Sequence, residues 1–185
     1  MLDKRKFYIN GRWVEPKKPN DFNVINPCNE DPCAIISLGS KEDTNAAIKS
    51  AKNAFETWKE TTKEDRLNYL EKLLSVYKKR SVEMAETISL EMGAPTDWAT
   101  DVQTASGQAH LEDFILRLKD FKFDKHFDEK SNNHIYYEPI GVCGLITPWN
   151  WPINQIALKV VPALATGCTM ILKPSEIAPI SGMLF

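Results

Sequence analysis

The sequence lacks any apolar run close to the roughly 18–20 residues that a membrane-spanning helix requires. Residues 1–5, MLDKR, are not followed by the apolar segment that makes a secretory signal. Neither sign of charge predominates, because 23 basic and 25 acidic side chains leave a net charge of −2. We therefore expect a cytoplasmic protein whose partners include neither a membrane nor a nucleic acid.

Cysteine is also scarce: the chain has four, none forms a CxxC pair, and none stands at zinc-finger spacing from a histidine. Cys143 and Cys168 fall in or beside predicted strands, where cysteine behaves as a small apolar residue. Cys28 and Cys33 are close in sequence, but that alone does not predict a disulfide or a zinc site. We assign no metal site.

A GxGxxG dinucleotide fingerprint is missing. The nearest pattern, Gly141-Val-Cys-Gly144, is too short and precedes a predicted strand, whereas the fingerprint follows one. This argues against a reductase built around that phosphate loop. Recognition of a pyrophosphate would have to come from elsewhere.

The most informative stretch that is present, Gly141 to Glu176, has the pattern of a β-α-β unit. The uncharged run Val142 to Ile146 predicts a strand buried on both faces. Pro152 suits the first turn of a helix, and Gly167 suits a left-handed cap at its end. Thr169 to Leu172 predict a second strand, and a crossover of this length favours parallel pairing.

Polar clusters follow both predicted strands, Thr147 to Asn150 after the first and Lys173 to Glu176 after the second. In open parallel sheets, ligands bind beyond the carboxyl ends of the strands. We therefore expect both clusters to face one cleft.

The preceding residues predict small strands and four helices. Residues 7–14 read as a hairpin around Asn10-Gly11, residues 15–33 as an extended surface segment, and residues 34–38 as a strand. Helices are expected from Ser40, from the capping box at residues 61–64, from Ser81 to Gly93, and from Thr96 to Lys119. Inward-facing positions are predicted at Ala47, Ala51, Ala54, Phe55, Trp58, Leu67, Leu70, Leu74, Tyr77, Val82, Ala85, Ile88, Met92, Val102, Ala105, Ala109, Leu111, Ile115 and Leu118.

Several separated blocks, in order, resemble the aldehyde dehydrogenase superfamily, NAD-dependent and in its amino-terminal portion. They are FYINGRWV at residues 7–14, INP at 25–27, EPIGVCGLITPWN at 138–150, PWNWP at 148–152, PALATGC at 162–168 and LKPSE at 172–176. The resemblance implies an α/β fold: a partial Rossmann-like cofactor domain with a parallel β-α-β unit, preceded by a helical region and a β-hairpin, with a projecting hairpin arm.

The resemblance divides the chain into three segments. Residues 1–119 would form the hairpin and helices of the cofactor-binding domain, residues 120–139 an oligomerisation arm, and residues 140–185 the β-α-β core. An exposed strand carrying Tyr136 and Tyr137 makes physical sense against a partner edge. The alternative is a surface hairpin packed on its own domain. The complete protein is expected to be a homo-oligomer, a dimer or tetramer.

The resemblance gives Asn150 and Lys159 catalytic roles. The asparagine of the PWN block donates a hydrogen bond to the oxyanion formed when a thiolate attacks an aldehyde. The plain alternative is that Asn150 caps the helix that opens at Trp151 or Pro152. Lys159 would lie near the catalytic apparatus and assist proton movement, or else be a snorkelling lysine at the helix edge.

The cofactor implied is NAD, with NADP disfavoured. Lys173 and Glu176 would bind the adenosine ribose, and the carboxylate would repel a 2′-phosphate. The alternative is a surface salt bridge of little energetic value. Ser175 is counted with them, although it also suits a cap for a helix starting near Pro179. Other residues expected to line the cofactor channel are Ile146, Thr147, Pro148, Trp149 and Asn150.

The implied activity is oxidation of a small aldehyde to a carboxylic acid through a cysteine thiohemiacetal and hydride transfer to NAD. The family's nucleophile, general base and nicotinamide-side glycine loop would lie beyond Phe185. We therefore expect these 185 residues to be inactive alone. The alternative is a non-catalytic binding or assembly module derived from that fold.

Overall fold

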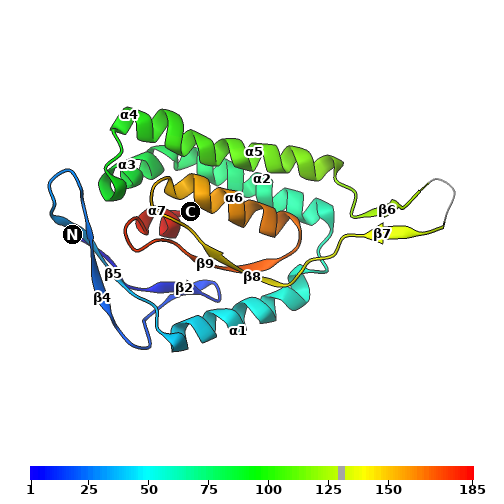
Figure 1. Cartoon of the computed structure of the whole chain (residues 1–185), viewed down its shortest axis with the longest axis horizontal. Coiled ribbons are helices and arrows are strands. Elements are labelled where there is room, and N and C mark those ends of the chain that lie inside the picture. The colour runs from blue at the N-terminus through cyan, green and yellow to red at the C-terminus, as the bar shows by residue number, and fades with distance from the viewer. Residues whose placement is uncertain (129–131) are drawn as a thin grey trace.

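The computed structural model describes residues 1–128 and 132–185 and shows a mixed α/β fold (Figure 1). Its strands are β1 (Leu2–Lys4), β2 (Phe7–Ile9), β3 (Arg12–Val14), β4 (Asp21–Ile25), β5 (Pro32–Ser37), β6 (Asp124–His126), β7 (His134–Tyr136), β8 (Val142–Ile146) and β9 (Thr169–Lys173). Its helices are α1 (Lys41–Trp58), α2 (Lys63–Lys79), α3 (Ser81–Met92), α4 (Thr96–Trp98), the π-helical segment η1 (Ala99–Thr104), α5 (Ala105–Asp120), α6 (Pro152–Ala165) and α7 (Ile180–Leu184).

The amino-terminal strands confirm one prediction and correct another. β2 and β3 form the expected hairpin, with Asn10 and Gly11 both at positive φ, as a type I′ turn requires. Residues 15–33 were expected to be an extended surface segment, and most of them are exposed. That prediction was incomplete, because residues 21–25 form the paired strand β4. That strand pairs antiparallel with β5 and buries Val24. The prolines of this segment lie outside β4, but the register of the β4–β5 pair shifts between Val24 and Ile25, where Ile25 pairs with Pro32.

Helix starts follow local capping chemistry. Ser40 is the N-cap residue of α1, as expected, and it also forms a reciprocal capping box with Asp43. The second box lies one residue later than predicted, at Thr62 and Asp65. The Thr61 hydroxyl instead donates to the Trp58 carbonyl at 2.6 Å, which helps to close the end of α1.

Some predicted inward positions are exposed because the phase of the helix differs from the prediction. Val82 is 66% exposed, since α3 turns Met84, Ala85 and Ile88 inward. The expected helix from 96 to 119 contains the π-helical turn η1, whose wider turn shifts the phase of α5. Ala105 and Ala109, two predicted inward positions of α5, are therefore on exposed surface. Ala54 of α1, also predicted to face inward, is exposed as well.

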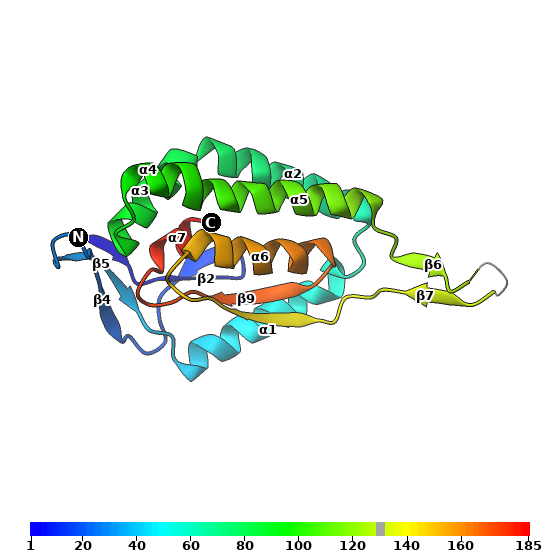
Figure 2. The same cartoon turned by 45° about the horizontal axis from the view of Figure 1, so that its top comes forward.

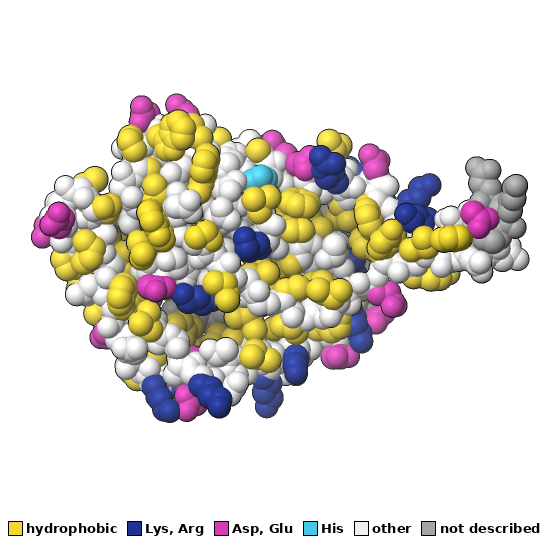
Figure 3. Space-filling model, viewed as in Figure 1, with side chains coloured by type: hydrophobic (Ala, Val, Ile, Leu, Met, Phe, Trp, Pro, Cys, Tyr) yellow, Lys and Arg dark blue, Asp and Glu magenta, His cyan; other side chains and the backbone are white. Residues whose placement is uncertain are grey.

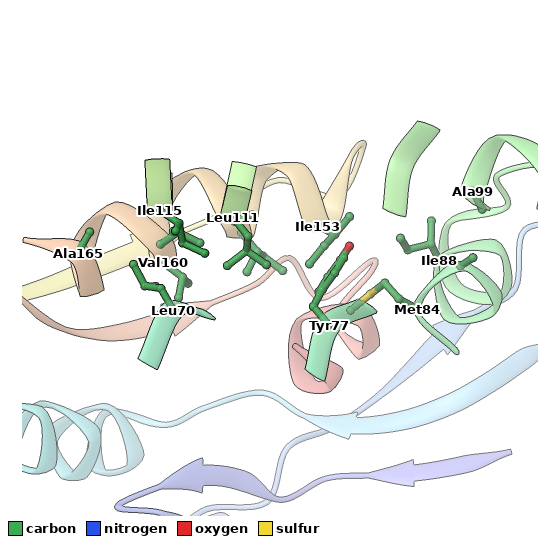
Figure 4. Close-up of a cluster of buried hydrophobic side chains, with 14 of the residues drawn as sticks. Leu70, Tyr77, Met84, Ile88, Ala99, Leu111, Ile115, Ile153, Val160 and Ala165 are labelled. Atoms are coloured by element: carbon green, nitrogen blue, oxygen red, sulfur yellow. The ribbon is translucent and has the colours of Figure 1, made fainter. Parts of the chain in front are cut away.

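One hydrophobic cluster joins the helices to the β-α-β unit. Its members come from α2, α3, α5 and α6, and Figure 4 shows Leu70, Leu111 and Ile153 pointing toward one another. α6 lies between helices α2 and α5 on one side and the β8–β9 sheet on the other (Figures 1 and 2). Ile153, Ile156 and Val161 of α6 are fully buried, so this helix fixes where β8 and β9 lie.

β8 and β9 pair in parallel across α6, as predicted. Burial of β8 on both faces is wrong, because Gly144 and Ile146 are exposed. α6 covers one face of the pair, but on the other face α1 packs mainly against β9. An uncharged strand sequence therefore did not guarantee a covered strand.

Residues 120–139 contain a hairpin of β6 and β7 that projects from the body (Figures 1 and 2). Phe121 packs against Phe123 and Tyr137 at its base, whereas Phe127 and Tyr136 are exposed. The predicted arm includes residues 129–131, which lie outside the described residues. In residues 1–128 and 132–185, no helix has the length and apolarity needed to cross a membrane.

Gly167 ends α6 in the left-handed region at φ +82°, as expected. A Cβ there would lie 2.5 Å from Arg66 Nη2 and 2.8 Å from Pro139 Cγ. Gly11 has φ +72°, but a Cβ there would meet nothing within 4 Å.

We predict that Gly11→Ala lowers the unfolding free energy by about 1 kcal/mol through backbone strain alone. Gly167→Ala should cost roughly 3 kcal/mol or more, because overpacking adds to that strain. Urea unfolding measures the unfolding free energy of both variants. An equal loss of unfolding free energy in the two would mean that packing around Gly167 adds nothing to the backbone strain.

Candidate functional site

The carboxyl ends of β8 and β9 lie side by side. Ile146 and Lys173 are register partners, and the Thr147 N–H donates to the Lys173 carbonyl at 3.3 Å. Asn150 and Glu176 each follow one of these paired positions by a few residues. The two polar clusters therefore leave the sheet from the same end.

Asn150 lies on the exposed turn that precedes α6. The N-cap residue of α6 is Trp151, and no side chain makes a capping hydrogen bond there. The interpretation of Asn150 as a helix cap is therefore wrong. Its amide remains available to a group outside the chain.

Lys173 and Glu176 form an ion pair, with Nζ donating to Oε2 at 2.9 Å. The hydrogen bond from Lys173 lowers the pKa of Glu176 below its ordinary value. Both side chains are largely exposed, so the pair adds little to stability. It presents a cationic donor and an anionic acceptor together, a combination that suits the hydroxyls of a sugar.

Apolar side chains lie next to this polar pair. Ile146, which is opposite Lys173 in the register, is 73% exposed, and Trp149, three residues later in the chain, is 47% exposed. Thr147 is buried, and its hydroxyl has no partner within the described part of the chain. Exposed apolar surface beside a pair whose donor and acceptor suit sugar hydroxyls is compatible with a nucleotide, which combines a flat ring with a ribose.

Ser175 stabilises the turn after β9. Its Oγ accepts a hydrogen bond from the Ile177 N–H at 3.3 Å. The expectation that it caps the next helix is wrong, because α7 begins at Ile180 with Pro179 as its N-cap residue.

Lys159 lies two turns into α6, away from Asn150. Its Nζ donates to Gln155 Oε1 at 3.4 Å, and its side chain is half-buried. It lines an apolar hollow of about 400 Å³ together with residues including Cys143, Leu145 and Pro162, but neither Asn150 nor Glu176 borders that hollow. This geometry does not bring Lys159 to the strand ends.

Comparison with known proteins decides the family. The family model described as "Aldehyde dehydrogenase family" matches residues 13–185. The chain belongs to the aldehyde dehydrogenase family. The match spans the strand ends and both polar turns, and it bears out the resemblance seen in the sequence.

Individual relatives agree with this assignment. A 3-succinoylsemialdehyde-pyridine dehydrogenase from a Pseudomonas species is 46% identical over all 185 residues, which cover 38% of that protein. An aldehyde dehydrogenase crystal structure from Bartonella henselae matches with 56% identity and a TM-score of 0.98, over 100% of this chain and 39% of that one. A mutant of aldehyde dehydrogenase C from Pseudomonas syringae, in complex with NAD⁺ and octanal, matches with 40% identity and a TM-score of 0.94, over 97% of this chain and 36% of that one.

This aldehyde dehydrogenase chain thus spans about 38% of the length of the curated relatives it matches. The neighbouring structures show NAD⁺ complexes in other members of the family.

Sequence reasoning gave no role to Glu91 of α3. Its carboxylate is 1% exposed and accepts hydrogen bonds from the N–H groups of Ile180 and Ser181, the latter at 2.9 Å. It therefore tethers the start of α7, which follows the Lys173–Glu176 turn. One signal was available: Glu91 follows Ile88 by three residues and so shares the buried face of α3.

The burial of Glu91 makes stability depend on pH. Burial raises its pKa from 4.5 to about 7, against the opposing effect of the two backbone N–H groups. The folded chain thus binds this proton more tightly than the unfolded chain. The resulting stability is fully present below about pH 4.5, declines as pH rises, and is lost once pH passes about 7.

We predict that the unfolding free energy falls by about 3 kcal/mol, relative to a Glu91→Gln variant, between pH 5 and 8. Glutamine keeps the shape of the side chain but does not titrate. Chemical denaturation at a series of pH values measures the difference. Parallel pH profiles for the two proteins would show that Glu91 does not change its protonation in this range.

Proposed function

We propose that these residues form the amino-terminal part of an NAD-dependent aldehyde dehydrogenase that oxidises a small aldehyde to a carboxylic acid. The observation that carries this proposal is the register pair Ile146–Lys173, which directs both polar turns to one end of the β8–β9 sheet. The proposed cofactor domain is Rossmann-like. Its proposed division is the one expected from the sequence, at residues 1–119, 120–139 and 140–185.

Asn150 is the proposed oxyanion donor. Attack of a thiolate on an aldehyde carbon leaves negative charge on the former carbonyl oxygen. An amide N–H already in place stabilises that charge without reorganising. The absence of any capping role for Asn150 supports this assignment, because its side chain is not committed to the helix.

Lys173 and Glu176 are the proposed ribose contacts, with Ser175 shaping the turn between them. NAD, when bound, accepts the hydride that the aldehyde loses. The chain's own contribution is to accept and donate hydrogen bonds to the sugar and to offer apolar surface at Ile146 and Trp149. Thr147 and Pro148 complete this surface through their backbone. The carboxylate of Glu176 disfavours the 2′-phosphate of NADP by charge repulsion.

Lys159 has the weakest support among the proposed catalytic residues. The snorkelling alternative is favoured by its contact with Gln155 and by its place in a hollow that neither Asn150 nor Glu176 borders. Its proposed role in proton movement would require the Gln155 contact to break.

The arm of β6 and β7 is proposed to pair with another subunit in a dimer or tetramer. Its exposed Phe127 and Tyr136 leave apolar surface on a projecting hairpin. Figure 3 shows hydrophobic side chains continuing along this arm, while charged side chains lie mostly at the margins of the body. A partner strand or surface would cover them.

We expect Asn150→Ala to lower kcat by about 10²–10³-fold in the complete enzyme, because one oxyanion donor is lost. The rate of NADH formation measures this. Asn154→Ala is the matched control, since Asn154 lies on α6 and its Oδ1 is 2.7 Å from His110 Nε2. The control should stay within a few-fold of wild type. A kcat for Asn150→Ala equal to that of the control would remove Asn150 from the mechanism.

Glu176→Gln should weaken NAD binding by roughly tenfold or more, because a charged hydrogen bond to the ribose is lost. The same change should narrow the preference for NAD over NADP. Equilibrium binding of both nucleotides to the complete enzyme measures these effects. Glu42→Gln is the control, since Glu42 is also exposed and pairs with a lysine, Lys18, at 2.6 Å. An unchanged NAD/NADP ratio would mean that the carboxylate does not touch the ribose.

A further inference from the structure

The turn that carries Glu176 is fixed at its first end by the sheet. Lys173 is the last residue of β9 and pairs in register with Ile146 of β8. Beyond it, the chain runs through residues 174–179 without regular secondary structure and then enters α7. The position of Glu176 therefore depends on how the second end of this turn is held.

That second end is held by a residue far away in sequence. Glu91 accepts the N–H groups of both Ile180 and Ser181, across 89 and 90 positions of the chain. α7 has five residues, and a helix so short does not hold its own position. Its N-cap residue, Pro179, supplies no side-chain cap, so the carboxylate of Glu91 satisfies these buried donors.

Packing brings the two ends of the turn together. A Cβ at Gly182 of α7 would lie 3.1 Å from Pro174 Cβ and 3.2 Å from Ile156 Cδ1. Pro174 directly follows Lys173, so α7 presses against the start of the turn that leads into it. Ile180 is also buried, in a second apolar cluster with Val24, Ala34 and Ile36. Residues 174–179 thus form a closed loop between β9 and a docked α7.

Burying a carboxylate at position 91 has an unfavourable desolvation free energy. Glu91 lies on a helix face shared with Ile88, and a buried charge destabilises a protein unless its hydrogen bonds are satisfied. An apolar side chain would fill the space but would leave the Ile180 and Ser181 N–H groups without a partner. The geometry therefore favours a role that needs α7 in one place.

We propose that Glu91 is a positioning residue for the cofactor site: by tethering α7, it sets where Glu176 presents its carboxylate. This inference rests on the proposed ribose contact of Glu176. Glu91 itself touches no substrate or cofactor. We expect a larger effect on nucleotide affinity than on kcat, because Glu91 tethers the turn that carries Glu176 and makes no hydrogen bond to the turn that carries Asn150.

The test is a double-mutant cycle on the complete enzyme, with Glu91→Gln, Glu176→Gln and the combined variant. Calorimetric titration with NAD gives Kd, and amide hydrogen exchange of the nucleotide-free enzyme follows the peptide covering residues 174–185. Glu86→Gln is the control, because Glu86 is an exposed glutamate on the same helix. We expect Glu91→Gln to raise Kd by about five- to tenfold. The same variant should show faster amide hydrogen exchange in the peptide covering residues 174–185. Its kcat should stay within about twofold of the wild-type value.

The combined variant separates positioning from general stability. If Glu91 acts through Glu176, adding Glu91→Gln to Glu176→Gln should change Kd by less than twofold, because coupled residues are not additive. Fully additive effects on Kd would overturn the inference. So would a Glu91→Gln protein with lowered Tm but unchanged Kd.

Two further arms keep the test decisive. Gly182→Ala would push Pro174, at the start of the turn, away from α7, and it should also raise the Kd for NAD. Gly39→Ala is the control and should leave this Kd unchanged, because its Cβ would make only an ordinary contact with Phe7 at 3.8 Å. If Glu91→Gln does not fold, an unchanged Kd in Gly182→Ala overturns the inference. If Glu176→Gln leaves Kd unchanged, the ribose contact is refuted. Hydrogen exchange then reports separately whether Glu91 fixes the loop.

Discussion

The candidate site depends on one physical constraint, the parallel pairing of β8 with β9 in a single register. Because Ile146 lies opposite Lys173, the turns that follow the two strands emerge together. A slip by one residue would reverse the face of every side chain in the strand. α6 prevents this, since its buried residues pack into the helical cluster while its ends connect directly to both strands. The core therefore stabilises the register, and the register assembles the site.

The helices outside the β-α-β unit affect the candidate site indirectly, through packing. α2 and α5 pack against α6, and α3 packs against α7, so these helices determine where α6 and α7 lie. Glu91 is the clearest case, because a carboxylate on α3 reaches the backbone of α7. Its pKa of about 7 follows from the same burial that makes it an effective tether. A residue outside the candidate site can in this way hold the backbone of an element that follows the site's turn.

Much of the fold was predictable because its signals are local. Asn10-Gly11, Ser40 with Asp43, and Gly167 each fix a turn or a cap through their own backbone preferences. The predictions were wrong where the local sequence is compatible with more than one helix start or more than one buried helix face. Two overlapping windows fit the second capping box, and the π-helical turn η1 shifts the phase of α5 without a distinct sequence mark. The uncharged run of β8 shows which residues could be buried, but neighbouring elements decide which of them are.

The sequence by itself determined the β-α-β unit, the ends of most helices, the residues that follow each strand, and the family. These depend on short-range preferences and on motifs that stay together along the chain. Only the tertiary structure decided that Asn150 does not cap α6, that Lys159 lines a hollow that Asn150 does not border, and that Glu91 accepts hydrogen bonds from the start of α7. Each of these depends on contacts between residues that are distant in sequence or on exact side-chain direction. Periodicity and composition carry no information about either.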